Sequence, residues 1–176
     1  MVEERLSAAD WVRTGLRVLA RSGFTALKAD RLAKALKVSR GSFYWHFADI
    51  EAFHQAVLRG WREIAYENIV EELQGTAEQR LRNLLSRAFR ADSPLERAVR
   101  AWAAAQPEAR VMVADVDGRR RDYLQRLLRE AGIAPDQAEA RARILYWAYL
   151  GHVLAGERPS SWTVVLEELT QLGLRR

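Results

Sequence analysis

The chain of 176 residues contains no cysteine, four prolines and three histidines. The absence of cysteine excludes a disulfide framework, thiolate metal sites, iron–sulfur clusters and a cysteine nucleophile. The longest apolar run, residues 144–151, is far shorter than the roughly 18 residues that a membrane span needs. The first residues lack the apolar core of a secretory signal. We therefore expect a cytoplasmic protein with no membrane partner.

Signals for β-strands are also scarce. Asp117-Gly118, a dipeptide typical of hairpin turns, precedes three arginines rather than an apolar strand. Apolar residues recur at helical spacing instead, and Gly, Pro, Ser and Asp residues separate the periodic segments. We predict an all-α fold of about nine helices, over residues 7–21, 29–36, 40–46, 50–73, 77–91, 94–105, 108–131, 136–156 and 161–172.

Charge is distributed unevenly along the chain. Residues 1–62 hold 11 basic and six acidic residues, whereas residues 63–176 hold 17 of each sign. A basic segment favours a polyanionic partner, although ordinary solvated helix faces would explain the charge alone. We predict a DNA-binding domain over residues 1–62 and a helical ligand-binding and dimerisation domain over residues 63–176. The helix predicted over residues 50–73 would join them.

The short helices predicted over residues 29–36 and 40–46 are joined by a tight turn. This is the pattern of a helix-turn-helix, whose second helix enters the major groove of DNA. Phe43 and Phe47 are predicted to bury one face of that helix. The predicted DNA-binding residues are Lys28, Lys37, Ser39, Arg40, Gly41, Ser42, Tyr44, Trp45 and His46. Arg40 is the expected base reader, Gly41 permits close approach of the backbone, and the lysines and residues 44–46 mainly hold phosphates.

The stretch Val38–Phe47, with Gly23-Phe24 and Leu32-Ala33 at matching spacings, resembles the recognition-helix signature of TetR/AcrR-type transcriptional regulators. The resemblance covers roughly residues 7–62; beyond residue 75 it is only architectural. In that family the third helix reads the operator, helices five to seven enclose a ligand and the last two helices pair two subunits. The resemblance implies a ligand-responsive regulator, a repressor, that binds a palindromic operator in double-stranded DNA as a homodimer.

Two positions depart from the family pattern. Lys28 stands where a Thr or Ser usually caps the second helix and contacts a phosphate. Ile50 stands where a Lys or Arg usually begins the fourth helix. One usual phosphate contact is therefore missing, or it is supplied by Lys28, by Lys37 or by the N-terminus of the fourth helix.

The second part of the chain is rich in aromatic residues. Residues 144–155 are apolar on nearly every side, which predicts core on one side and a second subunit on another. The predicted ligand-binding residues are Phe89, Trp102, Tyr123, Tyr146 and Trp147. An apolar or aromatic small-molecule effector fits this set, although a plain core explains each residue singly. The alternative is a DNA-binding regulator or architectural protein without a small ligand.

Catalytic and metal-binding patterns are not legible in the sequence. His46, His54 and His152 are poorly spaced for a metal site, and His54 is expected at the surface. Asp115–Gly118 lacks the third acid and the final glutamate of a calcium loop. We expect no enzymatic activity, no metal and no cofactor.

Overall fold

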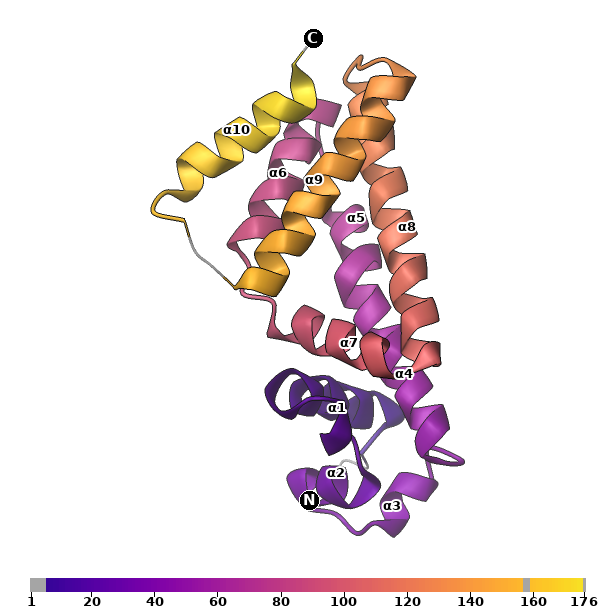
Figure 1. The fold of residues 1–176 in the computed structure, drawn as a ribbon. Helices are drawn as coiled ribbons and strands as arrows, with labels where there is room; N and C mark the ends of the chain where they lie inside the picture. The colour runs from indigo at the N-terminus through magenta and orange to yellow at the C-terminus, as the bar shows by residue number, and fades with distance from the viewer. Residues whose placement is uncertain (1–5, 157–158, 176) are drawn as a thin grey trace. The chain divides into compact units, whose positions relative to one another are not determined.

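The computed structural model describes residues 6–156 and 159–175, and every regular element within these ranges is helical (Figure 1). The elements are α1 (Ala8–Ser22), a 3-10 turn (Phe24–Ala26), α2 (Ala29–Leu36), α3 (Gly41–Tyr44), α4 (Ile50–Arg62), a π-helical segment (Glu63–Glu67), α5 (Asn68–Glu72), α6 (Ala77–Arg90), α7 (Pro94–Ala105), α8 (Pro107–Glu130), α9 (Pro135–Ala155) and α10 (Trp162–Leu174). When the unbroken run from α4 to α5 is counted as one helix, the described residues hold nine helices. The predicted all-α class is confirmed.

Local sequence signals set most helix ends. At the start of α1, the Ser7 backbone N–H donates to the Asp10 carboxylate at 2.9 Å, and the Asp10 N–H donates to Ser7 Oγ at 3.3 Å. The hydrogen bond from the Ser7 side chain is the main cause that lowers the pKa of Asp10. Asp49 caps α4 by accepting the Ala52 N–H at 2.7 Å. The predicted ends of α2 and α7 are confirmed to the residue, and the other ends lie within two residues.

Two details of the predicted helices are corrected by the structure. Helix α3 is a single turn, because Trp45 and His46 follow it as turn residues rather than as helix. The helix that begins at Ile50 is not uniformly α, because its turns widen at Glu63–Glu67. A π turn holds one residue more than an α turn, and such turns often occur at functional positions.

The first of two compact units combines the described residues up to Ala65 with Pro94–Val113. Its core lies among α1, α3 and α4, where Trp11, Phe43 and Phe53 are fully buried. Helix α7 packs along α1 in the same unit. The unit that contains the helix-turn-helix is therefore larger than residues 1–62, and the functional division at that point remains a prediction.

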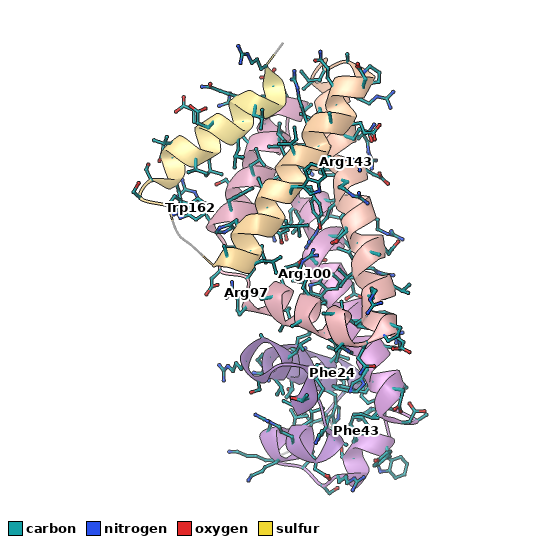
Figure 2. The ribbon with its side chains drawn as sticks, viewed as in Figure 1. Phe24, Phe43, Arg97, Arg100, Arg143 and Trp162 are labelled. Carbon is teal, nitrogen blue, oxygen red and sulfur yellow. The ribbon has the colours of Figure 1, made fainter. Side chains whose placement is uncertain are left out.

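A buried carboxylate joins α7 to α4 within this unit. Glu96 is only 5% exposed and accepts a hydrogen bond from the Trp61 indole N–H at 3.3 Å. The guanidinium of Arg100, labelled in Figure 2, approaches the same carboxylate at 2.7 Å. A buried carboxylate remains charged only where such partners replace its lost hydration. These contacts hold α7 in place against α4.

Gly15 allows α1 and α4 to approach closely. A Cβ atom added there would lie 2.7 Å from the Phe53 ring and 2.9 Å from a Val57 methyl group. We expect Gly15→Ala to lower the free energy of unfolding by about 1–3 kcal/mol through overpacking. Gly118→Ala is the control, because a Cβ there meets none of the described residues within 4 Å. The free energy of unfolding of Gly118→Ala should rise by about 0.5–1 kcal/mol. Urea unfolding should therefore show a loss of stability for Gly15→Ala and a gain for Gly118→Ala.

The second compact unit combines Tyr66–Ser93 with the described residues from Ala114 onward. Helix α10 packs against α6 and α9 (Figure 1). Gly173 permits this contact, since a Cβ there would lie 3.2 Å from Leu81. The core of the unit is a cluster of buried residues: Leu81, Leu85, Phe89, Tyr123, Leu124, Leu127, Leu128, Ile133, Ala138, Ala142, Leu145 and Tyr146.

Candidate nucleic-acid interface

A sharp turn after α2 sets the start of α3. Lys37 ends α2 with a left-handed backbone, φ 58°. The Lys37 N–H donates to the Lys34 carbonyl at 3.2 Å, and the Val38 N–H donates to the Ala33 carbonyl at 3.0 Å. Glycine or asparagine usually occupies such a position, because a Cβ is disfavoured there. The predicted break at residues 37–39 is confirmed.

The left-handed backbone at Lys37 predicts opposite effects on stability and DNA binding. Lys37→Gly should raise the free energy of unfolding by up to about 1 kcal/mol, because it relieves the disfavoured conformation. Lys37 is exposed and is a predicted phosphate contact. The same variant should therefore weaken binding to all DNA sequences and flatten the log–log salt dependence by about one unit for each phosphate that it no longer neutralises.

Lys37→Ala is the matched control for this pair of effects. It removes the charge but keeps the backbone strain, so it should lose DNA affinity without gaining stability. Thermal unfolding and DNA titrations at three salt concentrations measure both quantities. An unchanged salt slope in both variants would show that Lys37 contacts no phosphate.

Helix α3 rests on buried aromatic rings. Phe43, labelled in Figure 2, is 0% exposed, and its ring centroid lies 5.3 Å from Trp11 and 5.4 Å from Phe53. The ring of Phe47 lies 5.0 Å from Phe53. Edge-to-face contacts of this kind add to the hydrophobic stabilisation. Both phenylalanines lie in the core, as predicted, and they fix the orientation of α3.

Other side chains of the α3 region remain outside the core. Tyr44 is 49% exposed and Trp45 is 88% exposed, whereas Ser42 and His46 are half-buried. An indole ring so fully in water forgoes most of its hydrophobic stabilisation unless a partner covers it. The structure therefore leaves residues 44 and 45 accessible to DNA, and their contacts with it remain a prediction.

The backbone around Gly41 is also accessible. Ser39 and Gly41 are exposed, and a Cβ at Gly41 would meet, among the described residues, only Ser39 Oγ at 3.8 Å. Packing within the chain therefore does not require a glycine at this position. Close approach by a DNA backbone remains the predicted reason for it.

Arg40 lies immediately before α3 and is held by two neighbours. Its Nε lies 3.3 Å from the Asp30 carboxylate on α2, and one terminal nitrogen donates to the Tyr44 hydroxyl at 3.2 Å. The hydrogen bond to Tyr44, followed by the charge of Asp30, raises the pKa of Arg40. The pair is open to water, since the side chains of Arg40 and Asp30 are 61% and 72% exposed.

The two departures from the family pattern take different positions. Lys28 is exposed at the N-cap of α2, where its side chain makes no capping hydrogen bond. Ile50 is half-buried as the first residue of α4. Lys28 thus lies where a cation can reach a phosphate, whereas Ile50 offers no polar group.

The structure brings together three of the five predicted ligand residues. Phe89, Tyr123 and Tyr146 belong to the core cluster of the second unit. Trp102 belongs to the first unit, where it stacks on Phe24 with ring centroids 4.6 Å apart. Trp147 is 60% exposed on α9. Ligand binding by these residues remains a prediction.

Sequence reasoning missed a line of rings in the second unit. The His152 ring stacks on Phe89 with centroids 5.4 Å apart, and it forms a T-shaped contact with Trp162 at 5.1 Å. Tyr149 lies 5.9 Å from Tyr146. Tyr146, Tyr149 and His152 recur every three residues, so helical spacing could have indicated their common face.

His54 is not the surface residue that the sequence suggested. It is half-buried, and its Nε2 lies 3.1 Å from the Leu27 carbonyl oxygen. Its ring also contacts Phe24 at 5.0 Å and Trp102 at 5.5 Å. A single histidine with no periodic partner carries no sequence signal for such a position.

Among the described residues, no helix has the length and apolar character that a bilayer crossing requires. In the same part of the chain, no three His, Asp or Glu side chains gather as a metal-binding group would.

The comparisons with known proteins agree with this geometry. Residues 12–57 match the sequence profile described as bacterial regulatory proteins of the tetR family. No functionally curated protein matches the chain.

Similar solved structures extend the likeness over most of the chain. Escherichia coli NemR in its reduced form is 21% identical, with TM-score 0.76 and 93% of each chain covered. Salmonella enterica GusR is 21% identical, with TM-score 0.74, 100% of this chain and 99% of that one covered. A Saccharomonospora viridis protein described as a transcriptional regulator, in complex with choline, is 20% identical, with TM-score 0.75 and 93% of each chain covered. At these identities the likeness shows a shared fold.

Proposed function

We propose that this chain is a ligand-responsive repressor of the tetR family of bacterial regulatory proteins, whose sequence profile matches residues 12–57. It would act in the cytoplasm and bind a palindromic operator as a homodimer, with α3 in the major groove. The supporting observation is the α2–α3 pair, in which Arg40, Tyr44 and Trp45 remain exposed above a buried Phe43.

Selection of bound duplexes from a random DNA pool tests the proposal. Two recognition helices related by a two-fold axis require half-sites about one helical turn, 34–36 Å, apart. The expected product is therefore a palindrome whose half-sites have that spacing. An absence of enriched sequence would overturn operator binding, and enrichment of a single half-site would overturn the dimer.

We further propose that an apolar or aromatic small molecule binds in the second unit beside Phe89, Tyr123 and Tyr146. These rings lie in one cluster, and the Tyr146 hydroxyl donates to Asp117 Oδ1 at 2.5 Å. The choline complex of the S. viridis protein supports a ligand role for this fold. A regulator without a small ligand is the alternative. In that case DNA release would depend on another signal.

A thermal-shift screen against small aromatic and quaternary ammonium compounds, with choline included, distinguishes a regulator that binds a small ligand from one that does not. Under the ligand proposal a compound raises the melting temperature and weakens operator binding, because it prefers the DNA-free state. A ligand that weakens operator binding tenfold requires a coupling free energy of about 1.4 kcal/mol between ligand binding and operator binding. Tyr146→Phe should reduce the shift in melting temperature, whereas Tyr44→Phe, the same change in the first unit, should not.

The dimer is expected to form through an exposed apolar stripe on α9. Ile144, Trp147 and Leu154 are 43%, 60% and 61% exposed, and the stripe continues through exposed Gly151. Their spacing of three, four and three residues is that of a helix–helix seam. Trp147→Arg combined with Leu154→Arg should give a folded monomer that loses operator binding, because neither side chain is buried in the protomer.

Val111→Arg is the control for this variant. Val111 is 71% exposed on α8, so the substitution likewise replaces an exposed apolar residue with a charge. It should leave the dimer intact in sedimentation at micromolar concentration. A double arginine variant that still sediments as a dimer would disprove the seam on α9.

A further inference from the structure

One acidic residue stands in the surface that would face DNA. Between Lys28 and Phe47, Asp30 is the single acid among five basic residues. Its carboxylate is exposed in the first turn of α2, where negative charge favours the helix N-terminus. The same carboxylate would be repelled by phosphates, which carry one charge per about 1.7 Å of duplex. Its contact with Arg40 at 3.3 Å offers a reason for an acid at this position.

The contact constrains how Arg40 can approach a base. Asp30 engages Nε, on the inner edge of the guanidinium, and Tyr44 accepts from one terminal nitrogen. The remaining N–H groups at the outer end can still form two parallel hydrogen bonds, as guanine O6 and N7 require. In water the exposed pair contributes little. When DNA covers it, the lower local dielectric strengthens the attraction.

We infer that Asp30 is a specificity-determining residue of the DNA interface, which positions Arg40 for a guanine and holds it away from phosphates. An arginine already paired with a carboxylate gains less from a phosphate, which any sequence offers. It therefore distinguishes sequences better than an unpaired one. The inference rests on the proposed operator binding. In it, Asp30 lowers the affinity for DNA of any sequence and raises the preference for the operator.

The experiment uses the full chain and three duplexes: the selected operator, an altered operator and a random duplex. The altered operator carries a substitution at the base pair whose identity the Arg40→Ala variant no longer distinguishes. For Asp30→Ala we expect random-duplex affinity to rise by about fivefold or less, because a repulsive charge is removed. The ratio of affinities between the first two duplexes should fall about tenfold. In an Arg40→Ala background, Asp30→Ala should leave that ratio unchanged.

Glu51→Gln is the matched control, because it removes another exposed acid in the first turn of a helix, α4. It should change all three affinities alike and keep the ratio. Asp30→Asn repeats the test with a side chain of the same size, should Asp30→Ala unfold. If either Asp30 variant strengthens all duplexes equally, Asp30 is only a repulsive charge and the inference is overturned. A wild-type chain that enriches no operator would instead overturn the proposed function itself.

Discussion

Phe43→Ala is expected to lower the free energy of unfolding by about 3–5 kcal/mol. The ring is 0% exposed and contacts Trp11, Phe47 and Phe53, with centroid distances of 5.3, 5.3 and 5.4 Å. Alanine would leave a cavity that four aromatic neighbours cannot fill, since Tyr44 is also an edge contact. A single domain has only about 5–15 kcal/mol of stability in total, so the loss would threaten the folding of this unit.

Urea unfolding followed by circular dichroism measures this loss. Phe43→Leu keeps most of the volume and should cost less than about 1.5 kcal/mol. Tyr44→Ala, at the exposed neighbouring position, should change stability by only about 0.5 kcal/mol. If Phe43→Ala costs no more than Tyr44→Ala, α3 is not anchored by the ring of Phe43.

Arg40→Ala should produce the largest loss of operator binding. A bidentate arginine–guanine contact contributes about 1–3 kcal/mol of discrimination. A homodimer would lose it in both half-sites, so affinity for the selected operator should fall by at least about 30-fold. Affinity for random DNA should fall much less, because general binding depends on phosphate contacts distributed over the interface.

Arg40→Lys is the informative companion to that variant. Lysine keeps the positive charge but lacks the planar pair of donors that a guanine edge requires. Random-DNA affinity should therefore be retained while the operator preference disappears. Fluorescence-anisotropy titrations at a fixed salt concentration measure both quantities. Equal losses on operator and random DNA would identify Arg40 as a phosphate contact instead of a base reader.

The helix boundaries could be predicted because the signals that set them are local. The capping box of Ser7 and Asp10, the cap at Asp49 and the prolines that begin α7, α8 and α9 lie within one turn of the ends they define. The exposure of Tyr44 and Trp45 was predictable for the same reason. A one-turn helix cannot bury the aromatic residues Phe43, Tyr44 and Trp45 on a single side, and the structure buries only the first.

The positions that could not be predicted depend on contacts between distant parts of the chain. Trp102 is spaced like any core residue of α7, but its stacking on Phe24 joins segments that are 78 residues apart. His54 likewise meets the Leu27 carbonyl from another element. Helical periodicity shows that a residue is buried, but it does not show which helix covers it.

Trp147 illustrates a second limit of periodicity. Helix α9 is apolar on nearly every side, so its sequence does not distinguish a core face from an outer face. The structure turns Tyr146 inward at 4% exposure and leaves its neighbour Trp147 60% exposed. Trp147 lies in the exposed apolar stripe of α9, and a contiguous apolar patch of this kind is typical of a protein–protein interface. The predicted ligand set therefore mixed core residues with one from the proposed dimer seam.

The π-helical segment Glu63–Glu67 determines where the helix can lose a residue. A π turn accommodates one residue more than an α turn, so this segment equals a regular helix with a one-residue insertion. Deleting Ile64, which is 48% exposed, would restore the α geometry of these turns. A deletion elsewhere in the helix from Ile50 to Glu72 would rotate every later residue by about 100°. The helix can therefore lose one residue without a change of register, but only within Glu63–Glu67.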